Sequence, residues 1–291
     1  MATVPPAAQR RPAAMSANDV SSIVSLAWRS DDYPAAFAHF VSALRMADQI
    51  GLRAWVGVLL GNLGVLYWEL GAVERAHTCQ AAALDVALAL GDQSSQLTCL
   101  GNLAALLHDT GDTAQAQQTI DRAIDLGQTL QMPYYLCDHA CQAAEWAFAE
   151  QHFAAAARYC ELAHAAAETA HDADILFRVE LWQTRLAVAV GRATPAQAAA
   201  KFSALLESAG TLEKTAILHD HLYQLQPDPT RAQAAIAAYA RLYANVPRQR
   251  YRAKAQAIAH AAHLPVPTLL PPPWVSPLCQ TALPILNTVD L

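Results

Sequence analysis

Residues 61–70 read GNLGVLYWEL, and forty positions later residues 101–110 read GNLAALLHDT. The turn that follows returns at the same offset, with Gly71 matched by Gly111. A fixed period of this length is typical of a repeat array, in which each unit is one supersecondary element. The fold is therefore decided by this repetition and by how far it extends along the chain.

The period continues from about residue 17 to residue 209 without an insertion, and small residues recur at fixed positions within it. Small side chains let helix backbones approach closely, so these columns predict helices that nest against one another. A bulky side chain placed in a column should cost roughly 1–3 kcal/mol through overpacking. The first column is Ala36, Ala76, Ala116, Ala156 and Ala196, and the second is Ala43, Ala83, Ala123, Ala163 and Ser203.

Each unit reads as two helices. In the second unit, leucines at helical spacing run from Leu59 to Leu70 and stop at Gly71, and another helical run stops at Gly91. Glycine suits the left-handed residue that commonly ends a helix. The predicted helices cover residues 17–29, 33–49, 53–70, 73–90, 94–110, 113–130, 133–150, 153–170, 173–190, 195–209, 211–225, 229–244 and 247–262.

These residues resemble the tetratricopeptide repeat, whose pattern places Leu-Gly and Tyr at fixed spacing in the first helix and Ala and an aromatic residue in the second. Gln80 and Ile120 stand where Phe is usual, and the period of 40 exceeds the usual 34. Elongated repeats of this kind are similar to those of kinesin light chain and of bacterial signalling regulators. HEAT and armadillo repeats are the alternative, because they share the period range. The residues that carry the resemblance are Leu60, Leu63, Gly64 and Tyr67, with Ala36 and Phe40.

We therefore predict an all-α fold, a right-handed α-solenoid of about six antiparallel helix pairs over residues 17–245. Residues 1–16 should be disordered, and a capping helix over residues 246–264 should cover the apolar end of the array. Residues 265–291 hold seven prolines among large apolar side chains, which favours an extended or disordered tail over a helix. We expect this tail either to lie loosely on the last helices or to occupy the groove as a pseudo-ligand.

Composition narrows the class of function. A net charge of −6 argues against binding to nucleic-acid phosphates, and no apolar run is long enough to span a membrane. Six cysteines without a secretory signal indicate reduced thiols and a cytoplasmic setting. We find no phosphate-binding loop, serine-nucleophile elbow or HExxH motif, so we expect neither enzymatic activity nor a cofactor.

Two clusters have the chemistry of metal ligands. Cys137, His139 and Cys141 lie close in sequence, but a helix turns about 100° per residue, so the imidazole should point away from the two thiols. Zinc needs four converging donors, and Cys160 could add only one more. The His219–His221 cluster fails for the same geometric reason. We therefore expect packing thiols and no metal site.

The resemblance also implies where a ligand would bind, because in tetratricopeptide arrays the first helix of each unit lines the concave face. An amide column on that face could hydrogen-bond a peptide backbone of any sequence, and a largely aromatic column beside it offers contact area. The aromatic residues could instead belong to the core. The predicted groove residues are Asn62, Asn102 and Gln142, then Trp28, Trp68, His108 and Phe148, then Val65, Asp109, Glu145, Arg178 and Arg185.

The sequence thus predicts a protein–protein interaction module or scaffold that holds a peptide segment of a partner protein in its concave groove, with a regulatory role. We expect no nucleic-acid or membrane partner. Two alternatives remain open. One is a structural protein that self-associates through its tail or capping helix, and the other is an enzyme with an unrecognised site in the groove.

Overall fold

The computed structural model describes residues 32–281, and this part of the chain is built from helices without a strand. The predicted disordered segment, the predicted helix over residues 17–29 and Trp28 lie outside the described residues. The helices are α2 (Tyr33–Gln49), α3 (Arg53–Glu69), α4 (Val73–Leu90), α5 (Gln93–Asp109), α6 (Thr113–Thr129), α7 (Pro133–Ala149), α8 (Phe153–Ala170), α9 (Ala173–Ala189), α10 (Pro195–Glu207), α11 (Leu212–Leu225), α12 (Pro229–Asn245), α13 (Gln249–Ala261) and α14 (Val275–Gln280).

Helix starts follow local sequence signals. The side chains of Asp32, Asp92 and Asp112 each accept a hydrogen bond from a backbone N–H in the first turn of the helix that follows. Such caps satisfy donors that have no partner inside the helix. Pro133 and Pro195 occupy the first helical position, where a missing N–H does no harm. These signals explain why the predicted boundaries from residue 33 onward agree with the structure so closely.

The joints from α2 to α11 each contain a residue in the left-handed backbone conformation. Gly71 and Gly111 have φ angles of 83° and 88°, the left-handed region that glycine enters without strain. The equivalent joint of the next unit uses Gln151, at φ 63°, and Gln131 adopts the same region at φ 53°. The backbone therefore repeats even where the glycine does not.

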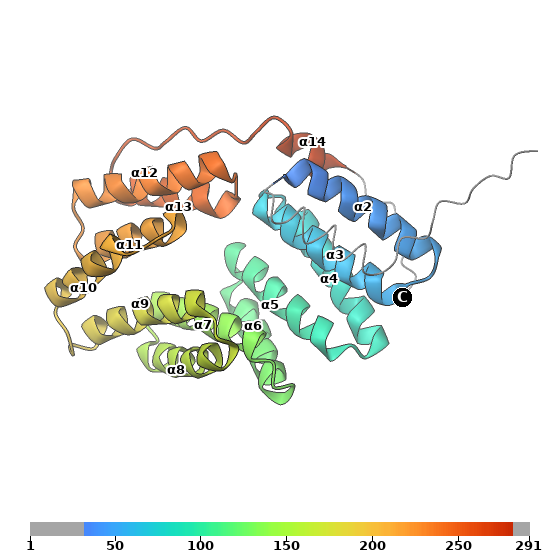
Figure 1. The fold of residues 1–291 in the computed structure, drawn as a ribbon, viewed down its shortest axis with the longest axis horizontal. Helices are drawn as coiled ribbons and strands as arrows, with labels where there is room; N and C mark the ends of the chain where they lie inside the picture. Colours follow the sequence, from blue (N-terminus) through green and yellow to red (C-terminus); the bar gives the residue numbers. More distant parts are fainter. Residues whose placement is uncertain (1–31, 282–291) are drawn as a thin grey trace, which may run out of the picture.

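The helix pairs stack in a row, as predicted for a right-handed α-solenoid. The first helices of successive pairs pack on one another, α3 on α5, α5 on α7 and α7 on α9. The pairs follow a curve that almost closes on itself, so that α13 comes back beside α3 (Figure 1). None of the helices among residues 32–281 combines the length and hydropathy needed to cross a bilayer.

The alanine columns hold in the first four units and fail in the fifth. Ala76, Ala116 and Ala156 are completely buried, whereas Ala196 and Ser203 are exposed. The prediction for the fifth unit was wrong because five residues join α9 to α10, against three between α7 and α8. The longer joint shifts the register, and Phe202 points into the core instead.

In the second unit, Gln80 occupies the position where the repeat usually has an aromatic residue. Its side chain is fully buried, and Nε2 donates a hydrogen bond to the Gly61 carbonyl oxygen at 2.8 Å. A methyl group on Gly64 would come within 2.8 Å of the same amide. The glycine of the repeat signature is thus required here by the neighbouring glutamine.

The two ends of the described array meet at a contact that we call the seam. At the seam, Arg248, the residue before α13, lies 3.6 Å from the Glu69 carboxylate of α3, and its Nε donates to the Tyr33 hydroxyl at 3.2 Å. Gln249 packs over Gly71 at the adjoining joint. The array is therefore closed by polar contacts between residues far apart in sequence.

The proline-rich tail crosses the seam. Leu269 packs against the core of α11–α13, and α14 then lies on α2–α4, where Trp274 stacks on Tyr33 with ring centroids 6.0 Å apart. Arg75 donates to the Gln280 and Thr281 carbonyl oxygens. The prediction that this stretch excludes helix was wrong for α14, because Pro277 sits in the first turn, where its missing N–H would have no partner anyway.

Candidate functional site

The first helices of the pairs, together with α13, are joined side to side by polar and aromatic contacts. We call the faces that carry these contacts the inner wall. Trp68 of α3 donates from Nε1 to the Asp109 carboxylate of α5 at 2.8 Å. On the far side, Lys254 of α13 lies 3.5 Å from the Asp220 carboxylate of α11. With the seam, these contacts run around the described array from α3 to α13 and back to α3.

The predicted amide column lies on three successive helices of the inner wall. Asn62 is on α3, Asn102 on α5 and Gln142 on α7, and each side chain is partly exposed. Within residues 32–281 none of the three makes a side-chain hydrogen bond. These amides therefore have donors and acceptors that only solvent or a ligand can satisfy.

Aromatic side chains link the next three helices. His108 of α5 stacks flat on Trp146 of α7, with ring centroids 4.3 Å apart and planes 4° from parallel. Phe148 of α7 contacts Trp182 of α9 at 5.2 Å. Trp68, His108 and Phe148 are partly exposed, whereas Trp146 and Trp182 are buried. The predicted aromatic residues thus border both the core and the inner surface.

Asp109 sits in a partly desolvated place on this wall. Half of its side chain remains exposed, but desolvation raises the pKa of its carboxyl above the ordinary value. The hydrogen bond from Trp68 and the nearby His108 act in the opposite direction, and the negative charge of Glu145 adds to the rise. A carboxylate in this environment favours a cationic or hydrogen-bond-donating neighbour.

The wall becomes basic from α9 onward. Arg178 donates to the Asp138 carboxylate at 3.1 Å and lies 3.9 Å from the carboxylate of Glu145. Arg250 of α13 pairs with Glu213 of α11 at 3.1 Å. These pairs are partly exposed, so each adds only about 0–1 kcal/mol to stability.

Arg185 is held differently. Its guanidinium lies over the rings of Phe148 and Trp182, at 4.5 and 5.1 Å from their centroids, and donates to the Gln224 side-chain oxygen of α11. Desolvation lowers the pKa of Arg185, and the more distant carboxylates of Asp220 and Glu145 only partly offset this effect.

The predicted residues within residues 32–281 lie on α3, α5, α7 and α9, the first helices of successive pairs. Trp28 lies outside the described residues, and Val65 is partly buried and joins none of the lateral contacts. The predicted site did not include four residues that the structure places on the inner wall: Trp146, Asp220, Gln224 and Lys254. The last three follow the break in the 40-residue period, so column counting could not reach them.

The cysteines lie in the helix-packing interfaces. Cys137, Cys141 and Cys160 are buried in one apolar cluster of α5–α9. Desolvation raises the pKa of Cys141 and Cys160 to about 12, so both thiols stay protonated. His139 is also buried, and its ring fills the space beside Gly101. Among residues 32–281, no three His, Cys, Asp or Glu side chains converge on a possible metal position.

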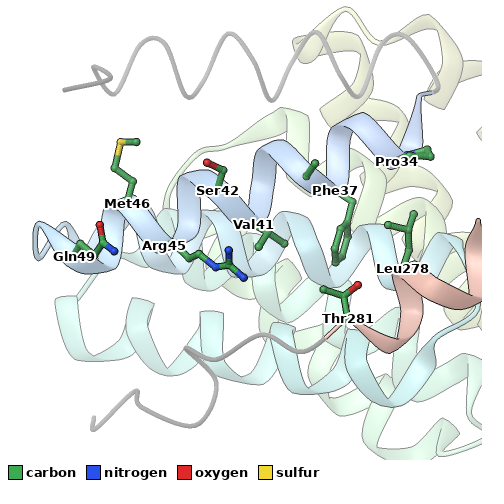
Figure 2. Close-up of a pocket in the computed structure, with 10 residues that line it drawn as sticks. Pro34, Phe37, Val41, Ser42, Arg45, Met46, Gln49, Leu278 and Thr281 are labelled. Atoms are coloured by element: carbon green, nitrogen blue, oxygen red, sulfur yellow. The ribbon is translucent and has the colours of Figure 1, made fainter. Parts of the chain in front are cut away.

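A cavity of about 510 Å³ lies elsewhere, along α2, with walls that include Phe37, Val41, Arg45, Leu278 and Thr281 (Figure 2). It contains none of the predicted site residues.

Comparison with known proteins agrees with the architecture. The Tetratricopeptide repeat family model matches residues 55–129, and no curated protein matches the chain. Among solved structures, the chain is similar to the crystal structure of a Rap protein complexed with competence and sporulation factor. The TM-score is 0.65 with 14% identity, over 84% of this chain and 67% of that one, a likeness that concerns the fold alone. The stacked helix pairs and the Leu-Gly and Tyr signature agree with tetratricopeptide repeats, which the family model places at residues 55–129.

Proposed function

We propose that the inner wall binds a peptide segment of a partner protein and that the chain acts as a regulatory scaffold without catalysing a reaction. The observation that carries this proposal is the column of Asn62, Asn102 and Gln142. Three partly exposed amides, forty residues apart and free of internal hydrogen bonds, stand on adjacent helices. An extended peptide presents N–H and C=O groups that such amides can bind.

Two further features support a peptide ligand. Trp68, His108 and Phe148 lie on the same three helices as the amides, and their partly exposed faces offer rigid contact area at small entropic cost. In the crystal structure of similar fold, the Rap protein is complexed with competence and sporulation factor, so the architecture is compatible with a bound ligand. All six cysteines are free thiols, which suits a cytoplasmic setting.

The test is an affinity selection from a synthetic heptapeptide library, followed by fluorescence anisotropy with the selected peptides. Replacing Asn62 and Asn102 together by Ala should weaken binding by roughly 5- to 100-fold, because each lost hydrogen bond contributes about 0.5–1.5 kcal/mol. The denaturant midpoint should stay nearly unchanged, since neither amide bonds within the protein.

A matched control is Gln118→Ala on α6, an exposed amide on a helix that does not face the inner wall. This variant should bind as tightly as the original chain. Equal binding by the double variant, or its unfolding, would assign Asn62 and Asn102 to a structural role and refute the proposal.

A further inference from the structure

One cation of the inner wall lacks the carboxylate partner that the others have. Arg185 forms no ion pair with a carboxylate of residues 32–281. The paired cations are Arg178 with Asp138 and Glu145, Lys254 with Asp220, Arg250 with Glu213 and Arg248 with Glu69. The difference matters because a partly desolvated positive charge favours an anion nearby.

The position of the guanidinium shows which of its groups remain available. Its central carbon, Cζ, lies over the rings of Phe148 and Trp182, and both rings attract the positive charge. A guanidinium carries five N–H donors, and Gln224 accepts from only one nitrogen, Nη1. The side chain is partly exposed, so the remaining donors can reach a ligand on the inner wall.

A purely structural role would explain part of this arrangement. Arg185 bridges α7, α9 and α11. An arginine that only joined helices would satisfy its charge with a carboxylate, as Arg178 does two turns earlier on α9. Glu145 and Asp220 are near enough to influence Arg185 but too far to form an ion pair. The lowered pKa of Arg185 agrees with a charge that is desolvated and incompletely compensated.

We infer that Arg185 is an anion-binding point of the inner wall and that it takes a carboxylate of the bound peptide. The inference rests on the peptide-binding function proposed above. A carboxylate can accept two parallel hydrogen bonds from one guanidinium, which fixes both its position and its orientation. Either an acidic side chain or the peptide's terminal carboxyl group supplies this chemistry. The contacts with two rings and the hydrogen bond to Gln224 hold the guanidinium in place before the ligand arrives, so little side-chain entropy is lost on binding.

The experiment uses the full chain and two synthetic heptapeptide libraries, one with free and one with amidated carboxyl termini. Peptides retained by the chain are sequenced by mass spectrometry. We expect either an enrichment of Asp or Glu at one position in both libraries, or selection from the free-terminus library alone. The first result identifies a side-chain carboxylate and the second a terminal one.

A double-mutant cycle then connects the carboxylate to Arg185. Neutralising the selected carboxylate, by amide substitution in the peptide, should weaken binding to the original chain by about tenfold or more, as expected for a charge-assisted hydrogen bond. The same change should have almost no effect on binding to Arg185→Gln. Arg178→Gln is the matched control, because Arg178 already has carboxylate partners, and it should keep the full preference.

Three results would overturn the inference. Peptides that bind without any need for a carboxylate would contradict it while leaving the proposed function intact. A carboxylate preference that persists in Arg185→Gln would place the anion site elsewhere. A failure to select any peptide would refute the proposed function and the anion site together. If Arg185→Gln does not fold, Arg185→Lys replaces it in the cycle, and an undiminished coupling there contradicts bidentate binding.

Discussion

The contact between α7 and α9 and the seam between α13 and α3 both join neighbouring parts of the inner wall, but they are built differently. Between α7 and α9, Cys141 and Val179 are fully buried in one continuous apolar cluster, and the ion pairs of Arg178 lie at its edge. At the seam, the polar contacts are those of Arg248 and Gln249, while Val246 packs against the core of α2–α5 and α14 lies across. Stacking depends on one continuous apolar interface, whereas closure depends on a few polar side chains together with Val246 and the apolar side chains of α14.

This difference separates two properties of the molecule. Burial of apolar surface contributes about 25 cal/mol per Å², so the stacked interfaces supply most of the stability of a solenoid. A few partly exposed polar contacts contribute little by comparison. Opening the seam should therefore change the shape of the array while most of its helices stay folded.

The largest effect should come from Gly101→Ala, inside a stacked interface. A Cβ at Gly101 would lie 2.1 Å from the buried ring of His139, so the ring or the helix that carries it would have to move. We expect a loss of about 3 kcal/mol or more, measured by urea unfolding. Gly61, the same position one unit earlier, has no atom closer than 3.8 Å to its Cβ position. Gly61→Ala should therefore gain about 0.5–1 kcal/mol, and equal effects at the two positions would contradict the packing described.

A smaller effect is expected at the seam. Arg248→Ala removes the contacts with Glu69 and with the Tyr33 hydroxyl and should cost roughly 1–3 kcal/mol. Small-angle X-ray scattering should show a larger radius of gyration with unchanged helical content by circular dichroism. Arg241→Ala, an exposed arginine on α12, is the control and should change neither quantity. An unchanged radius in Arg248→Ala would show that the other contacts across the seam, those of Val246, Gln249 and α14, keep the array closed.

The same comparison explains which parts of the fold could be predicted from the sequence. The period and the capping residues predict the helices of the stacked part, because those signals are local and repeated. The closure could not be predicted, since it depends on the small rotation added by each unit and on Arg248, which belongs to no column. The meeting of Glu69 with Arg248 is a consequence of the summed curvature.

The candidate site divides in the same way. Asn62, Asn102 and Gln142 were accessible to prediction because they share a column within the regular part of the array. The longer joint before α10 displaces every later column, so Gln224 and Lys254 could not be aligned with them. The stacking of Arg185 on two rings depends on side-chain orientation, which spacing alone does not determine.

Acid should weaken the stacked interfaces through buried histidines. Desolvation lowers the pKa of His139, and desolvation together with Arg185 and Lys254 lowers that of His221. In the unfolded chain both imidazoles have a pKa of about 6.5. Below that pH the unfolded state binds more protons than the folded state, so stability falls as the pH drops from about 7 toward the lowered values.

The measurement is urea unfolding at several pH values, from about pH 7 down toward the lowered pKa values of the two histidines. Replacing His139 and His221 together by Gln should flatten the pH dependence, whereas the exposed His260→Gln should leave it unchanged. A double variant that loses stability on acidification as steeply as the original chain would exclude these two histidines as the cause.

The smallest effect is expected at the joints. Gln131 and Gln151 hold left-handed backbone angles that cost about 1–2 kcal/mol for residues other than glycine. Glycine avoids this cost but loses more freedom on folding, so each change to Gly should raise stability by about 0.5–1 kcal/mol. The denaturant midpoint of each variant measures the gain. A loss of stability would show that the glutamine side chains make contacts that outweigh the strain.

The proposal that the inner wall holds the ligand is tested most directly by amide hydrogen exchange, with and without the tightest peptide selected from the library. We predict slower exchange in α3, α5, α7 and α9, the helices that carry the amide column and Arg185, and little change in α4, α6 and α8. Protection confined to the outer helices, or to α2 and α14 around the cavity of Figure 2, would contradict the account.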